Sequence, residues 1–241
     1  MSRTGESAGS LAGLADGPGS ALQAVLFDMD GLLVDSEPLW FEVESAIMAR
    51  LGGTWSPADQ EALVGGSLQR SLGYLLAKAA RPASPEMVGR WMIDGMVELL
   101  GTRPLPVMPG AMELLAEVMA AGLPYALVTS SELAIMETVL ARLDATFPVA
   151  VCGADVRRSK PDPEPYLLAA SRLGIEPGRS VVLEDSPNGV AAAEAAGCRV
   201  VAVPSVVPIS DAPGRLVVRS LAQLSLATLR GLVAAGPTGA D

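Results

Sequence analysis

Short runs of apolar residues alternate with amphipathic stretches along most of the chain. The runs cover residues 24–27, 125–128, 149–152, 180–183 and 199–203, and each has the length of one strand buried on both faces. The amphipathic stretches, at 111–121, 133–143, 164–173, 190–196 and 221–233, have the pattern of helices. This alternation predicts an α/β fold with a doubly wound, Rossmann-like parallel-sheet core.

A different pattern follows the first apolar run. Residues 39–51, 57–64, 68–80 and 85–100 are helix-like stretches separated by Gly, Pro and Ser, and no convincing strand lies among them. We therefore predict an inserted α-helical cap domain at 38–107, in a core made of residues 21–37 and 108–233. Residues 1–20 are rich in Gly, Ser and Ala without the pattern of a secretion signal, so we expect disordered tails at 1–20 and 234–241.

Composition narrows the class of protein. Half of the 241 residues are apolar, enough for a sizeable core, and the net charge of −10 argues against nucleic acid or an anionic membrane as a partner. No apolar run approaches the 18 or so residues that span a bilayer. The chain has no histidine, which excludes a Ser-His-Asp triad and a histidine-ligated metal. Cys152 and Cys198 lack the spacing of a zinc site, so we expect both to be buried free thiols. We expect a cytoplasmic enzyme that is either a monomer or a dimer.

Two acids follow the first predicted strand directly. Asp28 and Asp30 lie at its carboxyl end, where open α/β sheets place their ligands, and Gly31 then turns the chain. A strand followed by an ordinary polar turn is the alternative interpretation. Asp28 is suited to attack an electrophile as a nucleophile, and Asp30 to transfer a proton to the leaving oxygen. Because two carboxylates repel a phosphate, a cation is needed, and oxygen ligands favour Mg²⁺.

Three other loops carry matching chemistry. Thr129 and Ser130 end the second predicted strand and offer hydroxyl and amide groups to a phosphate, although such residues are also common helix N-caps. Lys160 lies in a proline-stiffened loop and would neutralise a phosphate. Glu184 and Asp185 end the strand at 180–183, and with the first two acids they complete a set of oxygen ligands for a cation.

A charge count links these loops. The acids Asp28, Asp30, Glu184 and Asp185 supply four negative charges, while Lys160 and Mg²⁺ return three positive ones. The surplus favours protonation of one carboxylate, and we assign that proton to Asp30 as the general acid.

The four loops together resemble the four ordered motifs of the haloacid-dehalogenase-like (HAD) hydrolase superfamily. The motifs are Asp28-x-Asp30-Gly31, Thr129-Ser130-Ser131, Lys160-Pro161 and Glu184-Asp185-Ser186-x-x-Gly189. Within the superfamily the chain is similar to the β-phosphoglucomutase-like phosphatases with a helical cap. The stretches 35–40 and 103–105 are similar to those of bacterial hexitol and 2-deoxyglucose-6-phosphate phosphatases.

The resemblance implies a role for each motif. It implies that Asp28 forms an aspartyl-phosphate and that Asp30 is the general acid and base and gives its backbone carbonyl to Mg²⁺. It implies that Thr129 and the Ser130 amide bind phosphate, and that Lys160 neutralises it. Glu184 and Asp185 are implied to hold the metal. The expected partner is a small phosphate ester, and the expected reaction is its Mg²⁺-dependent hydrolysis.

The departures from the family concern the substrate. The mutase of the family has a cap histidine and a cap arginine where this chain has Trp40 and Leu68, so we expect hydrolysis of a sugar or polyol phosphate. A β-phosphoglucomutase-type mutase or phosphotransferase, a phosphoglycolate phosphatase and a non-catalytic binding protein are the alternatives. The candidate substrate contacts from the cap are Gly65, Ser67, Gln69 and Arg70; Arg70 could also be a solvated helix charge.

Overall fold

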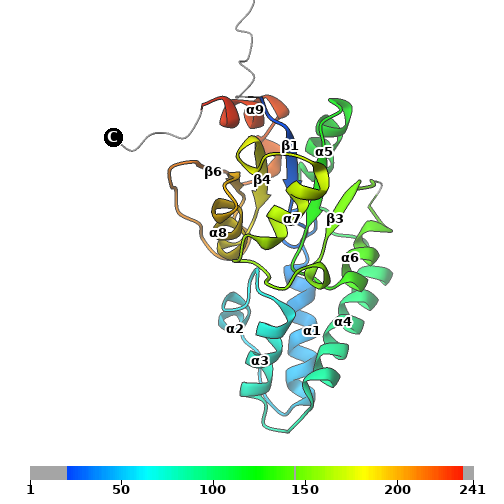
Figure 1. The fold of residues 1–241 in the computed structure, drawn as a ribbon. Coiled ribbons are helices and arrows are strands. Elements are labelled where there is room, and N and C mark those ends of the chain that lie inside the picture. Colours follow the sequence, from blue (N-terminus) through cyan, green and yellow to red (C-terminus); the bar gives the residue numbers. More distant parts are fainter. Residues whose placement is uncertain (1–20, 144, 236–241) are drawn as a thin grey trace, which may run out of the picture.

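The computed structural model describes residues 21–143 and 145–235, and within them the strands form one parallel sheet (Figure 1). The sheet has the order β3-β2-β1-β4-β5-β6, which is that of a doubly wound fold and confirms the predicted class. The strands are β1 (Ala24–Phe27), β2 (Tyr125–Val128), β3 (Val149–Val151), β4 (Ser180–Glu184), β5 (Arg199–Ala202) and β6 (Arg215–Val217).

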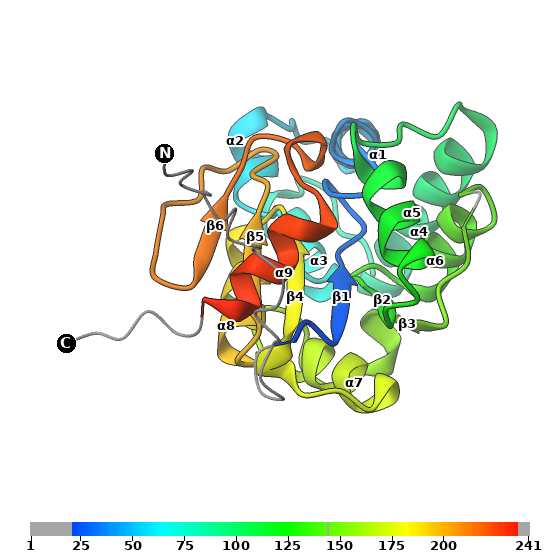
Figure 2. The ribbon, with the colours of Figure 1, turned by 90° about the horizontal axis from the view of Figure 1, so that it is seen from above.

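Helices cover both faces of the sheet (Figure 2). Side chains alternate along the strands, so Val25 and Phe27 enter one core while Leu26 enters the other. The first core is covered by α5 (Ala111–Ala120) and α9 (Leu226–Ala234), and the second by α7 (Glu164–Leu173) and α8 (Pro187–Ala195). Helix α6 (Leu133–Leu140) follows β2 and packs against α4 (Pro85–Thr102), one of the inserted helices.

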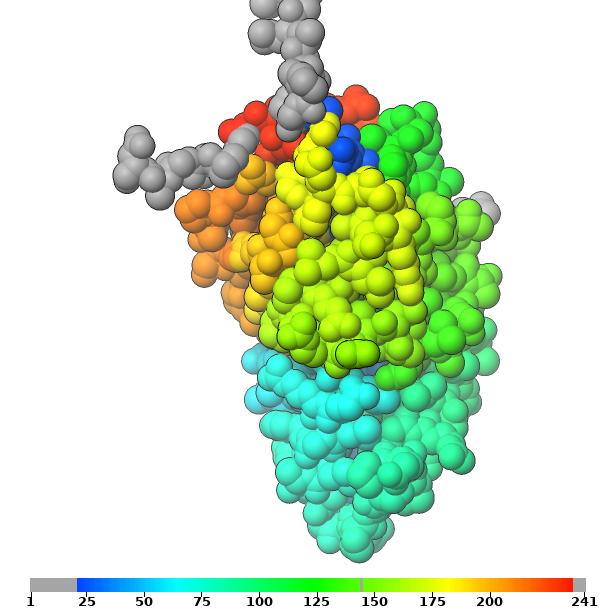
Figure 3. All heavy atoms as spheres, in the orientation of Figure 1, coloured from blue at the N-terminus to red at the C-terminus, as the bar shows by residue number. Residues whose placement is uncertain are grey.

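Four helices lie between β1 and α5 in the sequence and form the elongated lower part of the molecule (Figures 1 and 3). They are α1 (Glu37–Arg50), α2 (Pro57–Glu61), α3 (Leu68–Lys78) and α4 (Pro85–Thr102). Each of α2, α3 and α4 begins after a serine whose hydroxyl accepts a backbone N–H of the first turn, as expected for N-caps. Each helix lies on a predicted stretch, but the ends differ. Helix α1 begins two residues earlier and ends one residue earlier than predicted, α2 ends three residues early, α3 ends two residues early and α4 runs two residues further.

The two chain segments that connect the inserted helices to the core are paired. Val34 and Val107 form an antiparallel bridge, the Asp35 N–H donates to the Pro106 carbonyl at 2.7 Å, and the Met108 N–H donates to the Leu33 carbonyl at 2.9 Å. The chain therefore enters and leaves the inserted part at neighbouring points.

The carboxyl-terminal region differs from the prediction. Strand β6 was not expected, because it is a three-residue edge strand with half-buried side chains and a weak apolar pattern. The helix predicted at 221–233 is divided into a short 3₁₀ turn, Leu221–Gln223, and α9, because Ser225 caps the latter at Thr228. Two further 3₁₀ turns occur at Gly153–Asp155 and Pro177–Arg179.

Cys152 and Cys198 are buried free thiols, as predicted. No helix in the described part of the chain is long and apolar enough to cross a membrane. The disordered tails predicted at 1–20 and 234–241 lie outside the described residues, apart from residues 234 and 235.

Candidate active site

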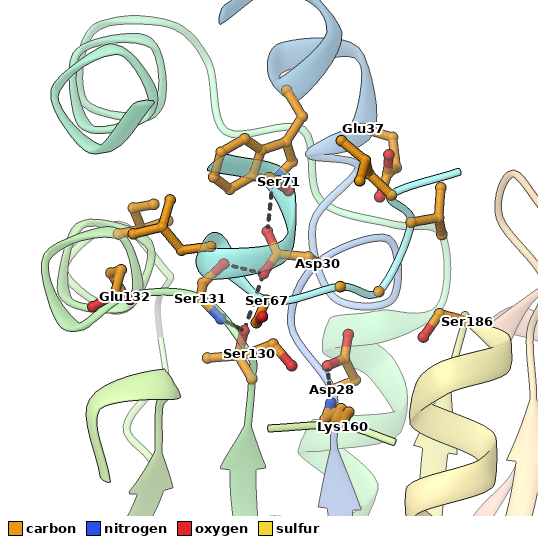
Figure 4. Close-up of a pocket in the computed structure, with 18 of the residues that line it drawn as sticks. Asp28, Asp30, Glu37, Ser67, Ser71, Ser130, Ser131, Glu132, Lys160 and Ser186 are labelled. Carbon is orange, nitrogen blue, oxygen red and sulfur yellow. Dashed lines mark hydrogen bonds and ion pairs between the residues drawn. The ribbon is translucent and has the colours of Figure 1, made fainter. Parts of the chain in front are cut away.

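The predicted site residues meet at the carboxyl ends of three neighbouring strands. Asp28 follows β1, Thr129 follows β2 and Glu184 ends β4, and β1 lies between the other two in the sheet. Lys160 comes from the loop before α7, and its peptide bond to Pro161 is cis. Figure 4 shows Asp28 and Lys160 below the inserted helices, with Asp30 reaching towards those helices.

Lys160 joins two of the acids. Its ammonium group donates to Asp28 Oδ1 at 2.5 Å, to Glu184 Oε1 at 2.6 Å and to the Val128 carbonyl at 2.9 Å, and all three side chains are buried. Burial alone would lower the pKa of Lys160, but the carboxylates of Asp28 and Glu184 raise it above its usual value. Lys160 is therefore a fixed cation beside Asp28.

Glu184 is held by protein donors on both oxygens. Tyr166 donates its hydroxyl to Oε1 at 2.5 Å, and Oε2 accepts the backbone N–H of Asp185 at 3.1 Å and the Ser186 hydroxyl at 3.2 Å. Tyr166 was not among the predicted site residues, because an aromatic residue in a predicted helix such as α7 is typical of the hydrophobic core. The arrangement fixes the orientation of Glu184 before any ligand binds.

Three acids form a compact cluster. One oxygen from each of Asp28, Glu184 and Asp185 lies within 4.8 Å of the others. Burial raises the pKa of Asp28 and of Asp185 well above its usual value; for Asp28 the Lys160 charge opposes the rise, and neighbouring carboxylates add to both shifts. Gly31, at φ +75°, passes so close that a Cβ there would collide with the Asp185 carboxylate. A hard divalent cation fits this donor set, because it would offset charge that the protein alone leaves unbalanced.

The Asp30 carboxylate lies apart from this cluster. Oδ1 accepts the Ser36 hydroxyl at 2.7 Å and the Trp40 indole N–H at 3.4 Å. Oδ2 accepts the hydroxyls of Thr129 at 3.0 Å and Ser131 at 2.7 Å. Its side chain lines the cavity, a position suited to proton exchange with a leaving oxygen. The assignment of the surplus proton to Asp30 stays a prediction.

The loop after β2 offers groups for an anion. The Thr129 hydroxyl oxygen accepts the Ser131 N–H at 3.0 Å, which orders the turn. The hydroxyl oxygen of Ser130 is buried, lines the cavity and has no hydrogen-bond partner among the described residues. Buried polar atoms are rarely left without a partner, so this hydroxyl retains the capacity to form a hydrogen bond.

The cavity encloses about 760 Å³, including its mouth, between the strand ends and the inserted helices. Of the predicted cap contacts, Gly65 and Ser67 line it. Gln69 and Arg70 are exposed and are not among the lining residues, and the Arg70 guanidinium donates to the Ala62 carbonyl at 2.7 Å. Trp40 and Leu68, which stand where the mutase has its histidine and arginine, also line the cavity. The inserted part contributes further lining residues that were not predicted as substrate contacts: Glu37, Glu44, Gln60, Leu63, Val64, Gly66, Ser71 and Met92.

Two acids of α1 stand on this wall. Burial raises the pKa of Glu37 to about 7 and that of Glu44 to about 8, and nearby carboxylates add to both shifts. Gln60 donates its amide to Glu37 Oε2 at 3.0 Å. A signal for these residues exists in the sequence, since positions 37, 40 and 44 have the i, i+3, i+7 spacing of one helix face.

Comparison with known proteins gives consistent results. The model of the family described as haloacid dehalogenase-like hydrolase matches residues 25–203. Hexitol phosphatase B of Escherichia coli is 36% identical over 216 residues, covering 88% of this chain and 94% of that protein. A phosphorylated carbohydrates phosphatase of Thermotoga maritima is 34% identical, covering 73% and 82%. The crystal structure of CbbY from Rhodobacter sphaeroides in complex with phosphate superposes with a TM-score of 0.79 at 29% identity, covering 86% and 99%.

Proposed function

The chain belongs to the haloacid dehalogenase-like hydrolase family, and on that premise we propose that it is a Mg²⁺-dependent phosphatase acting on a small sugar or polyol phosphate. The observation that carries the proposal is the pairing of buried Asp28 with Lys160, at 2.5 Å, on the floor of a cavity that Asp30 also lines. The relatives named as phosphatases of hexitols and of phosphorylated carbohydrates support the substrate class.

The metal would be held by the acid cluster. Asp28, Glu184 and Asp185 supply the side-chain oxygens, and the resemblance adds the backbone carbonyl of Asp30. When bound, Mg²⁺ would supply positive charge that offsets the charge of the phosphoryl group. Glu184 already accepts protein hydrogen bonds on both oxygens, so we expect Asp28 and Asp185 to be the more available ligands.

The residues divide the reaction into two steps. Asp28 attacks phosphorus, the bond to the alcohol oxygen breaks, and Asp30 gives that oxygen a proton. Water then attacks the aspartyl-phosphate and gives a proton to Asp30, which releases phosphate and restores Asp28. Throughout, Lys160, the Thr129 hydroxyl and the Ser130 amide offset the charge of the phosphoryl group.

The charged side chains that line the cavity favour a phosphate ester whose alcohol part is uncharged. Lys160 is the single cationic side chain among the described lining residues, against the six acids Asp28, Asp30, Glu37, Glu44, Glu132 and Asp185. Trp40 and Leu68, which replace the histidine and arginine of the mutase, both line the cavity. A second phosphate or a carboxylate would find no cation there, which disfavours the mutase and phosphoglycolate alternatives.

Phosphate release from a panel of sugar, polyol and glycolate phosphates tests the proposal. We expect release with Mg²⁺, none with EDTA, and a loss of at least about a thousandfold in kcat for Asp28→Asn. Asp94→Asn, an exposed residue of α4, is the matched control and should keep wild-type activity. Equal activity of Asp28→Asn and the wild type would overturn the proposed nucleophile, and phosphate transfer to a second sugar would favour the mutase.

A further inference from the structure

One buried acid of the cavity has no role in the proposed chemistry. Glu44 is 3% exposed and lines the cavity from α1, on the wall opposite the strand ends. Its Oε2 is enclosed and has no hydrogen-bond partner among the described residues. The indole N–H of Trp55 has no partner within ordinary hydrogen-bond limits either, and its interaction with the Glu44 carboxyl lowers the pKa of Glu44 against the larger effect of burial.

Glu44 accepts no hydrogen bond of ordinary geometry from the described residues, so its carboxyl on the cavity wall retains capacity for a further partner. Buried polar atoms nearly always form hydrogen bonds, because an unsatisfied one costs free energy. With its pKa raised to about 8 by burial and by Glu37, the Glu44 carboxyl is neutral near pH 7, so it has one O–H donor and acceptor oxygens. This combination matches a hydroxyl group, which also donates and accepts.

The surroundings of Glu44 suit the carbon chain of a polyol. Gln60, Ser67 and Ser71 line the same wall with neutral polar groups, while Trp40 and Met92 offer apolar surface to the carbon atoms. In Figure 4 the inserted helices lie above Asp28 and Lys160, so a substrate with its phosphate at these two residues would extend its alcohol part towards the helices.

We propose that Glu44 is a specificity-determining residue, which binds a hydroxyl group on the alcohol part of the phosphate ester. The inference rests on the proposed phosphatase activity, since it assigns the substrate preference of that site. Glu44 takes no part in bond breaking, so its loss alters the choice of substrate and leaves the chemical steps intact.

A pair of substrates of equal length tests the assignment. Sorbitol 6-phosphate carries hydroxyls along its six-carbon chain, and hexyl phosphate carries none. We expect Glu44→Leu to lower kcat/KM for sorbitol 6-phosphate at least about tenfold and to leave that for hexyl phosphate unchanged or raised. Glu44→Gln keeps a donor and an acceptor and should retain most of the preference. Glu42→Gln, at an exposed position of the same helix, is the control and should retain all of it.

The outcomes separate this inference from the proposed function. An equal loss for both substrates in Glu44→Leu, or an unchanged ratio, would overturn the role of Glu44 while the phosphatase activity stands. No phosphate release by the wild type from any ester would overturn the proposed function and this inference with it. If Glu44→Leu does not fold, a binding measurement replaces the kinetic one. The affinity for sorbitol 6-phosphate is compared between Asp28→Asn and the double variant Asp28→Asn, Glu44→Ala. Equal affinities would overturn the assignment of Glu44.

Discussion

Lys160 shows how one buried side chain organises the site. It is 4% exposed and donates to two carboxylates and one carbonyl oxygen. A buried cation is stable only where its charge is compensated, and the same requirement holds for the acids around it. Removal of the cation would leave Asp28 and Glu184 facing each other without compensation. The same hydrogen bonds therefore fix the position of the Lys160 side chain and keep its ammonium group protonated before any ligand binds.

From the raised pKa of Glu44 we predict that the unfolding free energy depends on pH. Its pKa is about 8 in the folded protein, because of burial and then Glu37, against an ordinary value of 4.5. The folded state thus keeps a proton that the unfolded chain releases, and the unfolding free energy falls as pH rises from about 4.5 to about 8. Glu44→Gln lacks this titration. We expect the wild type to lose about 4 kcal/mol more than the variant across this window, measured by urea unfolding.

Glu42→Gln is the control for that measurement. Glu42 is exposed on the same helix and pairs with Arg103, which holds its pKa below the usual value. Its removal should leave the wild-type pH dependence above about pH 5 unchanged. Parallel curves for the wild type and Glu44→Gln would contradict the raised pKa of Glu44.

At the scale of elements, a polar network fixes the segment that carries Gly65 and Ser67. Asp59 in α2 accepts the N–H of Ser56 at 2.9 Å and its hydroxyl at 2.6 Å, and the Tyr74 hydroxyl of α3 at 2.8 Å. Lys78 of α3 also donates to Asp59. Hydrogen bonds from Lys78 and Ser56 lower the pKa of Asp59. The network joins α2 to α3 across the loop that lines the cavity.

Asp59→Ala should therefore weaken both stability and substrate binding. We expect a loss of about 2 kcal/mol in unfolding free energy, because the α2 cap and the links to α3 are lost together. A raised KM should accompany it, because Gly65 and Ser67 lose their support. Glu61→Ala, an exposed position at the end of α2, serves as the control for denaturant unfolding and kinetics. A stability equal to that of this control would show that the network contributes little.

Some residues of the site could be predicted from the sequence and others could not. The strand ends with Asp28, Thr129 and Glu184 were predictable, because parallel strands place their carboxyl ends on one edge and local patterns mark each strand. Tyr166 and Ser205, which hold Glu184 and Asp185, were not, because contacts between distant segments leave no local pattern. Gln69 and Arg70, predicted as substrate contacts, are exposed in the first turn of α3 and do not line the cavity, because the packing of α3 decides which side of that turn faces inward.

For the whole molecule, the inserted helices and the core meet closely beside the cavity. Gly65, at φ +64°, lies against Ser186, and the Asn188 amide donates to the Val64 carbonyl at 3.3 Å. A Cβ at Gly65 would collide with the Ser186 side chain. The two parts can therefore approach this closely only with glycine at position 65.

Gly65→Ala should hold the two parts away from each other. We expect kcat/KM to fall about tenfold or more, because the lining loop is displaced and the backbone is also strained at positive φ. Gly73→Ala is the matched control, since that glycine lies inside α3 with open space around it and alanine favours the helix. Kinetics for the two variants, with thermal unfolding to confirm folding, test this. Wild-type kcat/KM in Gly65→Ala would show that the contact does not shape the cavity.

The paired connectors at 33–35 and 106–108 have a consequence for how such a protein can evolve. Because the chain leaves and re-enters the core at hydrogen-bonded neighbours, the ends of the inserted segment are already joined in space. A segment with adjacent ends can be exchanged for another without altering the path of the sheet. Asp28, Lys160 and Glu184 lie outside that segment, and Glu44 and Gly65 lie within it. If the proposed roles hold, the residues for the reaction and those for the choice of substrate lie on segments that can be exchanged separately, and a new specificity can arise by replacement of the inserted segment alone.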